Sequence, residues 1–124
     1  MLKVLVVDDS PIGRHVMEAM LIDANMELIF ASNGKDAYQK AEIEKPDLII
    51  LDIMMPHHDG IEVTEMIRNN KEIKNTPILI ATALDDRDTK MRAIKAGAND
   101  VIYKPINKKE FLGKLAGIID IAFD

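Results

Sequence analysis

Polar residues that can handle a phosphoryl group follow four short apolar runs of this sequence. Asp8 and Asp9 follow the first run, and Asp52, Thr82 and Lys104 follow the other three. Three carboxylates, a hydroxyl and an amine suit a divalent cation together with a phosphoryl group. If each run is a buried parallel strand, all five residues lie along the carboxyl edge of one sheet, where open α/β sheets bind their ligands.

Three carboxylates at one edge would repel one another strongly. At about 4 Å and an effective dielectric constant near 20, each pair costs on the order of 4 kcal/mol, so a divalent cation would relieve the repulsion. Oxygen ligands favour Mg²⁺, or Mn²⁺, over zinc, and a backbone carbonyl just after Asp52 could complete the site. Asp52 also directly precedes a loop, 53–59, so it can face a donor and attack phosphorus. Lys104 and Thr82 would then neutralise and hydrogen-bond the phosphoryl oxygens.

The elements that must position these residues alternate along the chain. Short apolar runs and helical patterns follow each other five times, which indicates βα units and a parallel sheet. Right-handed crossovers would place helices on both faces, so we predict an α/β fold, a (βα)5 three-layer sandwich. The second strand is short and mixed in polarity, and we expect it at an edge. The predicted strands are 3–8, 27–31, 47–52, 77–82 and 100–103.

Capping residues mark the predicted helices. Ser10 and Pro11 suit an N-cap and a first helical position, and Gly97 suits a helix end. The next three helices are predicted to begin at Asn33-Gly34, after Gly60, and at Asp85 or Asp86, and the last helix begins near Lys108. The expected core face of the first helix is Val16, Met17, Met20, Leu21 and Ala24, and we expect the eight methionines to pack in the core.

The bulk composition excludes several classes of function. The 124 residues fit one domain, 1–124. A net charge of −5 disfavours nonspecific binding to nucleic acid or anionic membrane, and the absence of cysteine rules out a thiolate nucleophile or a zinc-thiolate site. No apolar run approaches the roughly 18 residues of a spanning helix, and the first residues lack the features of a signal peptide. We therefore expect a soluble cytoplasmic protein.

Several motifs, in one order along the chain, resemble the receiver domain of two-component response regulators. They are Asp8-Asp9, the segment PDLIILDIMMP at 46–56 with Asp59-Gly60 after it, Thr82-Ala83, Ala96-Gly97-Ala98 and Lys104-Pro105. The resemblance covers essentially the whole chain. It implies a single receiver domain over 1–124 with a flavodoxin-like, CheY-like sheet of strand order 2-1-3-4-5.

The resemblance also implies a role for each site residue. Asp52 would be the phosphoacceptor, and Asp8, Asp9 and Asp52, with the backbone carbonyl of Met54, would hold Mg²⁺. Thr82 and Lys104 would contact the phosphoryl group, and the Lys104-Pro105 peptide bond would be cis.

The implied function is a phosphoacceptor switch in a phosphorelay. A histidine kinase or phosphotransfer protein would phosphorylate Asp52, and the face formed by the fourth helix, fifth strand and fifth helix would then change shape. That face would control an output domain, an effector or a phosphorylation-dependent homodimer. Such a protein catalyses only its own phosphorylation and dephosphorylation and is not an enzyme toward other substrates. The run 82–87 is similar to receivers fused to diguanylate cyclases, so a stand-alone regulator and one domain of a longer protein both remain open.

Two departures from the family pattern affect signalling. The switch aromatic that receivers commonly carry three residues before the lysine is Val101 here, and Tyr103 lies on the same predicted strand face as a partial substitute. The residues that flank the path of an attacking water in the family, Met54 and Leu84, are both apolar. We therefore predict slow self-dephosphorylation.

Other interpretations are less well supported. A Mg²⁺-dependent aspartyl phosphatase of the haloacid dehalogenase type needs a second Asp where Met54 stands, and a nucleotide-binding fold needs a Gly-rich loop after the first strand. A degenerate receiver that acts only in protein interaction would usually lack an acidic residue, the threonine or the lysine, and none is lost. We expect His57 and His58 to be solvated rather than metal ligands, and His15 to be a surface residue.

Overall fold

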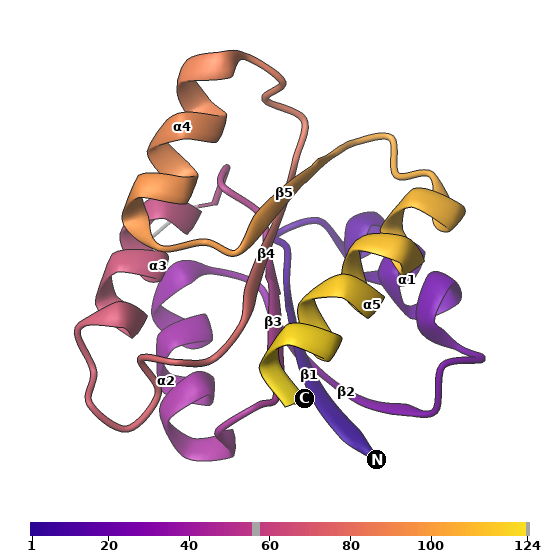
Figure 1. Ribbon diagram of the computed structural model, residues 1–124, viewed down its shortest axis with the longest axis horizontal. Helices are drawn as coiled ribbons and strands as arrows, with labels where there is room; N and C mark the ends of the chain where they lie inside the picture. Colours follow the sequence, from indigo (N-terminus) through magenta and orange to yellow (C-terminus); the bar gives the residue numbers. More distant parts are fainter. Residues whose placement is uncertain (56–57, 124) are drawn as a thin grey trace.

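The computed structural model describes residues 1–55 and 58–123 as a three-layer α/β sandwich (Figure 1). Strands and helices alternate from the first element to the last, as the sequence pattern predicts. The elements are β1 (Leu2–Val7), α1 (Pro11–Leu21), β2 (Met26–Ala31), α2 (Gly34–Glu44), β3 (Leu48–Leu51), α3 (Gly60–Arg68), β4 (Ile78–Thr82), α4 (Arg87–Ala96), β5 (Asp100–Tyr103) and α5 (Lys108–Phe123).

The sheet has five parallel strands in the order β2-β1-β3-β4-β5. This confirms the predicted fold class and the edge position of β2. In Figure 1, α1 and α5 lie on one face of the sheet, and α2, α3 and α4 lie on the other. The order places β1 directly beside β3, so the residues that follow these two strands become neighbours.

Side chains of the central strands alternate between two hydrophobic cores. Leu5 and Val7 of β1 face the core under α2, α3 and α4, whereas Val4 and Val6 face the core under α1 and α5. All four are at most 2% exposed. Helices on both faces leave no polar side for these strands, which explains why their sequences are apolar without alternation.

The helix caps agree with the sequence signals except at α3, which begins at Gly60 rather than after it and is capped by Asp59. The side chains of Ser10, Asn33, Asp59 and Asp86 each accept a hydrogen bond from a backbone amide in the first turn of α1, α2, α3 and α4, respectively. Asp86, rather than Asp85, is therefore the cap of α4. Gly97 ends α4 with a φ of 116°, a conformation that glycine adopts without steric cost. The Lys104-Pro105 bond is cis, as expected.

Two expectations about packing are wrong. Val16 is 41% exposed, because α1 covers the sheet with a stripe centred on Met17 and Leu21. The methionines also do not all pack in the core. Met17 is buried, and Met20, Met26 and Met55 pack against the cores while partly buried, but Met1, Met54 and Met91 are 83%, 57% and 59% exposed.

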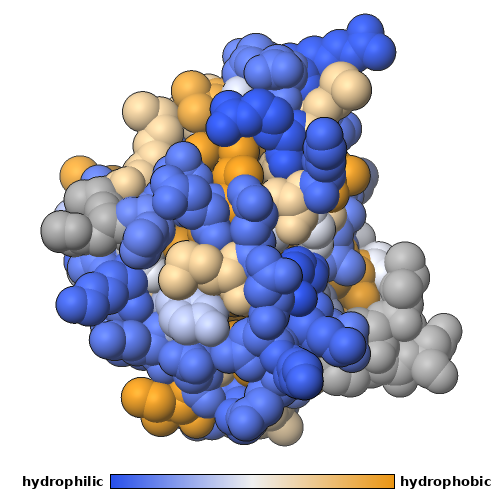
Figure 2. Space-filling model, turned by 90° about the vertical axis from the view of Figure 1, so that its left-hand side faces the viewer, coloured by the Kyte–Doolittle hydropathy of each residue, from blue (hydrophilic) through white to orange (hydrophobic). Residues whose placement is uncertain are grey.

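The outer surface over α2, α3 and α4 is mostly hydrophilic, and hydrophobic side chains show there only in small, separate areas (Figure 2). Within the described residues, none of the helices combines the length and the apolar character that a bilayer crossing requires.

Candidate functional site

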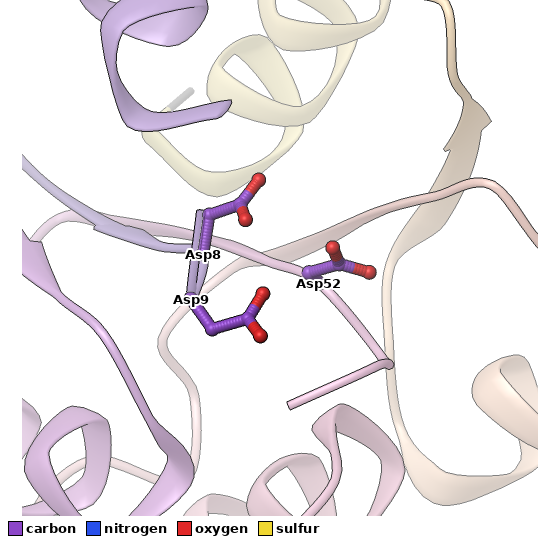
Figure 3. A group of neighbouring side chains, drawn as sticks. All are labelled: Asp8, Asp9 and Asp52. Atoms are coloured by element: carbon purple, nitrogen blue, oxygen red, sulfur yellow. The ribbon is translucent and has the colours of Figure 1, made fainter. Parts of the chain in front are cut away.

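Three of the predicted site residues meet at the carboxyl edge of the sheet. Asp8 and Asp9 follow β1 and Asp52 follows β3, and Val7 and Leu51, the last residues of these strands, are paired. One carboxylate oxygen from each of the three aspartates lies within 4.8 Å of those from the other two. Figure 3 shows the three side chains projecting into one region. The convergence expected from strand order is confirmed.

Asp8 is held on several sides. Its side chain is 5% exposed, its Oδ1 accepts a hydrogen bond from the Ser10 amide at 2.9 Å, and its Oδ2 accepts one from Lys104 Nζ at 2.7 Å. Arg14 Nη1 donates to the backbone carbonyl of Asp8 at 2.7 Å. The first turn of α1 therefore fixes both the main chain and the side chain of Asp8.

Asp52 is also largely buried, with 8% of its surface exposed. Its Oδ2 accepts a hydrogen bond from Lys104 Nζ at 2.9 Å, and its Oδ1 accepts a longer one from the Met54 amide at 3.3 Å. Asp9, in contrast, is exposed. The site thus combines two buried carboxylates with one that faces solvent.

Lys104 bridges the two buried carboxylates. Burial by itself lowers the pKa of Lys104, but the hydrogen bonds that it donates to Asp8 and Asp52 and the negative charge of these carboxylates outweigh burial, so its pKa lies above the ordinary value. The ammonium is therefore charged at neutral pH. Its charge offsets part of the repulsion between Asp8 and Asp52.

Thr82 is the predicted site residue that the structure does not bring into contact with the carboxylates. It ends β4, between the strands that carry Asp52 and Lys104. Its side chain is fully buried, and its Oγ1 accepts a hydrogen bond from the Leu84 amide at 3.2 Å. The hydroxyl is close in the fold to the site but is engaged with the loop after β4.

A depression of about 610 Å³ opens over the carboxylates. Its lining is Asp8, Asp9, Ser10, Asp52, Ile53, Met54, Met55, Asp59 and Lys104. Met54, with 57% of its surface exposed, stands at its rim, whereas Leu84 packs against the core under α2, α3 and α4. Of the two apolar residues predicted to flank the path of water, Met54 lines this depression and Leu84 packs away from it.

Two glycines lie directly against the site: sequence reasoning missed Gly13, and it used Gly60 only as part of a motif and as a helix-start signal. A Cβ on Gly13 would lie 2.2 Å from Asp8 Oδ2, and one on Gly60 would lie 2.2 Å from the backbone oxygen of Asp52. Glycine is unfavourable in a helix, so its presence in the first turn of α1 was a usable signal of a close approach.

The remaining sequence candidates lie outside the cluster of carboxylates. Val101 is buried and Tyr103 partly buried on the same face of β5, as predicted. His58 is about half exposed, with its Nδ1 3.3 Å from Glu62 Oε2, and His15 is exposed on α1. The expectation for His57 lies outside the described residues.

Comparisons with known proteins agree with this geometry. The sequence matches the response regulator receiver domain family over residues 4–116. It is 39% identical over 117 residues to the alkaline phosphatase synthesis transcriptional regulatory protein PhoP of Bacillus subtilis, covering 94% of this chain and 48% of that protein. It is 31% identical over 119 residues to PilH of Pseudomonas aeruginosa, covering 96% and 98%.

Solved structures show the same relationship. The chemotaxis response regulator CheY4 of Vibrio cholerae superposes with a TM-score of 0.88 at 35% identity, covering 95% of this chain and 98% of that one. The chain spans about half the length of PhoP, the regulator that carries a transcriptional role, and nearly all of PilH and CheY4.

Proposed function

The chain belongs to the receiver domain family of two-component response regulators, and from this premise we propose that it is a switch whose Asp52 accepts a phosphoryl group. The observation that supports the proposal most directly is the bridge from Lys104 Nζ to Asp8 and Asp52 at 2.7 and 2.9 Å. It places a fixed positive charge beside the carboxylate that would attack phosphorus. We further propose that the protein acts as a signalling module and not as an enzyme toward other substrates.

The site suits a divalent cation with oxygen ligands. Asp8, Asp9 and Asp52 bring carboxylate oxygens within 4.8 Å of one another, and one ammonium leaves their summed charge negative. Together with the backbone carbonyl of Met54, these residues would hold Mg²⁺, or Mn²⁺ in its place. A bound cation supplies positive charge that offsets the charge of the phosphoryl oxygens.

In the proposed transfer, a carboxylate oxygen of Asp52 forms a bond to phosphorus while the bond from phosphorus to the donor's imidazole nitrogen breaks. The imidazole leaves with the bonding electron pair, and Asp52 carries an acyl phosphate. Lys104 can follow the negative charge from the carboxylate to the phosphoryl oxygens. Its position beside Oδ2 means that this needs only a small movement.

Signal output would begin at Thr82. The Thr82 hydroxyl accepts a hydrogen bond from the Leu84 amide and keeps its own proton free to donate. Movement of this side chain toward a phosphoryl oxygen would therefore pull on the loop between β4 and α4 through that bond. We propose that the face formed by α4, β5 and α5 changes shape as a result and is recognised by an output domain, an effector or a second copy. Val101 is too small to act as the swinging aromatic ring, so Tyr103 is the candidate to respond to Thr82.

We propose that the histidine donor docks along α1. Ile12 and Val16 of this helix and Ile22 directly after it are 76%, 41% and 73% exposed, and a shallow depression runs along the helix, lined by Pro11, Ile12, His15, Val16 and Ala19. The helix begins one residue after Ser10, beside the carboxylates, so a partner seated on it would reach Asp52. An amphipathic helix of the donor would bury these side chains.

The docking proposal predicts a selective defect. Val16→Asp should lower phosphotransfer at least ten-fold from a histidine kinase that phosphorylates the wild-type protein, yet leave phosphorylation by acetyl phosphate unchanged. Ile43→Asp, on α2 at the opposite face and 77% exposed, is the matched control and should change neither rate. Equal loss in both variants, or loss with acetyl phosphate as well, would contradict docking on α1.

The phosphoacceptor is tested by incubation with Mg²⁺ and acetyl phosphate followed by intact mass measurement. We expect one phosphoryl adduct on the wild-type protein and none on Asp52→Asn. Absence of an adduct would favour a receiver that acts only in protein interaction. An adduct that persists on Asp52→Asn would refute the assignment of Asp52, and continuous release of inorganic phosphate from unrelated phosphate esters would favour a phosphatase.

A further inference from the structure

Gly13, in the first turn of α1, lies directly against the carboxylate of Asp8. A Cβ built on Gly13 would be 2.2 Å from Asp8 Oδ2, 2.6 Å from Cγ and 2.9 Å from Oδ1. Real Cβ atoms essentially never approach another heavy atom closer than 3.0 Å. The whole carboxyl group therefore occupies space that any other residue at position 13 would need.

Asp8 has little freedom to give way. Its side chain is 5% exposed, and both oxygens are engaged, by the Ser10 amide and by Lys104 Nζ. Rotation of the carboxyl plane alone would not help, since Cγ itself lies 2.6 Å from the added carbon. A side chain at position 13 must either swing the carboxyl group away from these partners or lift α1 from the sheet.

The first turn of α1 is itself tied to the site. Ser10 Oγ accepts from the Gly13 amide at 3.2 Å, and Arg14 Nη1 donates to the Asp8 carbonyl at 2.7 Å. Lifting α1 would therefore strain contacts that hold the main chain of Asp8. Movement of the carboxyl group is the less costly response, and it changes the position of Asp8 relative to Asp9 and Asp52.

Backbone conformation does not account for Gly13. Gly13 lies within a regular helix, whereas the glycine with a positive φ is Gly97. A Cβ built on either of two other helical glycines, Gly113 and Gly117 of α5, would have no neighbouring atom within 4 Å. Gly60 does make a close approach, but to the backbone of Asp52 rather than to a carboxylate.

We propose that Gly13 is a positioning residue for the cation site. Because Gly13 has no β-carbon, the carboxylate of Asp8 fits under α1, where both of its oxygens reach their hydrogen-bond partners. In this position Asp8 completes the set of carboxylate ligands with Asp9 and Asp52. This inference rests on the proposed function, because it concerns the Mg²⁺ or Mn²⁺ that these carboxylates would hold.

The first test compares Gly13→Ala with Gly113→Ala in the full chain. Both replace a helical glycine by the same residue, but only the first adds a carbon against a site carboxylate. Titration with Mn²⁺, followed by electron paramagnetic resonance of the unbound ion, should show at least ten-fold weaker binding for Gly13→Ala, equivalent to about 1.4 kcal/mol. Gly113→Ala should bind like the wild type.

The second test is a melting experiment without metal, with each glycine variant made in the wild-type and Asp8→Ala backgrounds. Alanine is a better helix former than glycine, so Gly113→Ala should raise the Tm in both backgrounds. Gly13→Ala should lower the Tm in the wild-type background and raise it where Asp8 has lost its carboxylate. Such a reversal of sign reports direct coupling between the two positions.

The outcomes separate the inference from the proposed function. If Gly13→Ala binds Mn²⁺ as tightly as the wild type, the positioning role is overturned whatever the melting shows. If it weakens binding but raises the Tm equally in both backgrounds, the effect does not pass through Asp8, and the inference also fails. If the wild-type protein binds no Mn²⁺, the proposed cation site is wrong, while the melting cycle still decides whether Gly13 and Asp8 are in contact.

Discussion

Replacing Lys104 with methionine should destabilise the protein, because the change leaves two buried carboxylates without the ammonium that they share. Lys104 Nζ lies 2.7 Å from Asp8 Oδ2 and 2.9 Å from Asp52 Oδ2. The side chains of these aspartates are 5% and 10% exposed. Methionine keeps most of the length and apolar character of the lysine stem, so the loss reports mainly on charge.

The size of the effect follows from burial. Removing one partner of a buried ion pair costs about 3 to 5 kcal/mol. The side chain of Lys104 is 27% exposed, so water screens part of its charge, and we expect a loss of about 2 to 3 kcal/mol in the free energy of unfolding. For a chain of 124 residues, the usual unfolding entropy converts this loss into a Tm lower by about 8 to 12 °C.

Mg²⁺ should reverse the loss. The proposed cation would bind the same carboxylates, and in the variant it would no longer compete with the ammonium, so it should bind more tightly than in the wild type. At a concentration 100 times its Kd, a ligand that binds only the folded state contributes about 2.7 kcal/mol. Saturating Mg²⁺ should therefore return the Tm of Lys104→Met close to that of the metal-free wild type.

The assay is thermal unfolding with EDTA and with Mg²⁺, and the control is Lys114→Met. Lys114 Nζ lies 3.1 Å from Asp100 Oδ2, and its side chain is 26% exposed, but Asp100 is 34% exposed. Removing this solvated pair should cost less than about 1 kcal/mol, with no dependence on Mg²⁺. The reasoning is refuted if the two variants melt within about 2 °C of each other in EDTA, or if Mg²⁺ fails to raise the Tm of Lys104→Met.

Two other residues support predictions of different kinds. Met54 stands at the rim of the depression, so Met54→Asn, which can hydrogen-bond a water near Asp52, should shorten the half-life of the acyl phosphate several-fold when donor is removed and intact mass is followed; an unchanged half-life would exclude this role for Met54. Arg68 donates from its guanidinium to the carbonyls of Lys74, Thr76 and Gly97 and to Asn99 Oδ1, so Arg68→Ala should lower the free energy of unfolding in urea by about 2 to 4 kcal/mol. Arg68→Lys should recover less than half of that loss, because an ammonium group cannot reach several carbonyls at once as the planar guanidinium does. Full recovery of the free energy of unfolding would show that charge alone matters.

Much of the fold was predictable because its signals are local. The apolar runs, the caps at Ser10 and Asn33 and the glycine at position 97 each act on neighbouring residues, and the structure confirms them. The exposure of Val16 and of three of the eight methionines was not predictable in this way, because burial depends on how wide a stripe the sheet covers on each helix. The types of the residues in a helix do not determine the width of this stripe.

The sequence by itself determined which chemistry this protein can support and at which edge of the sheet it lies, since each of these residues follows a strand whose apolar run marks it as buried. The tertiary structure alone decided how they are used. Lys104 bonds to Asp8 across 96 positions of the chain, the Thr82 hydroxyl turns to the Leu84 amide, and Gly13 admits the carboxylate of Asp8. The contacts of Lys104 and Gly13 with Asp8 depend on the relative placement of whole elements to within a few tenths of an ångström, and that placement results from packing over both faces of the sheet rather than from any local pattern.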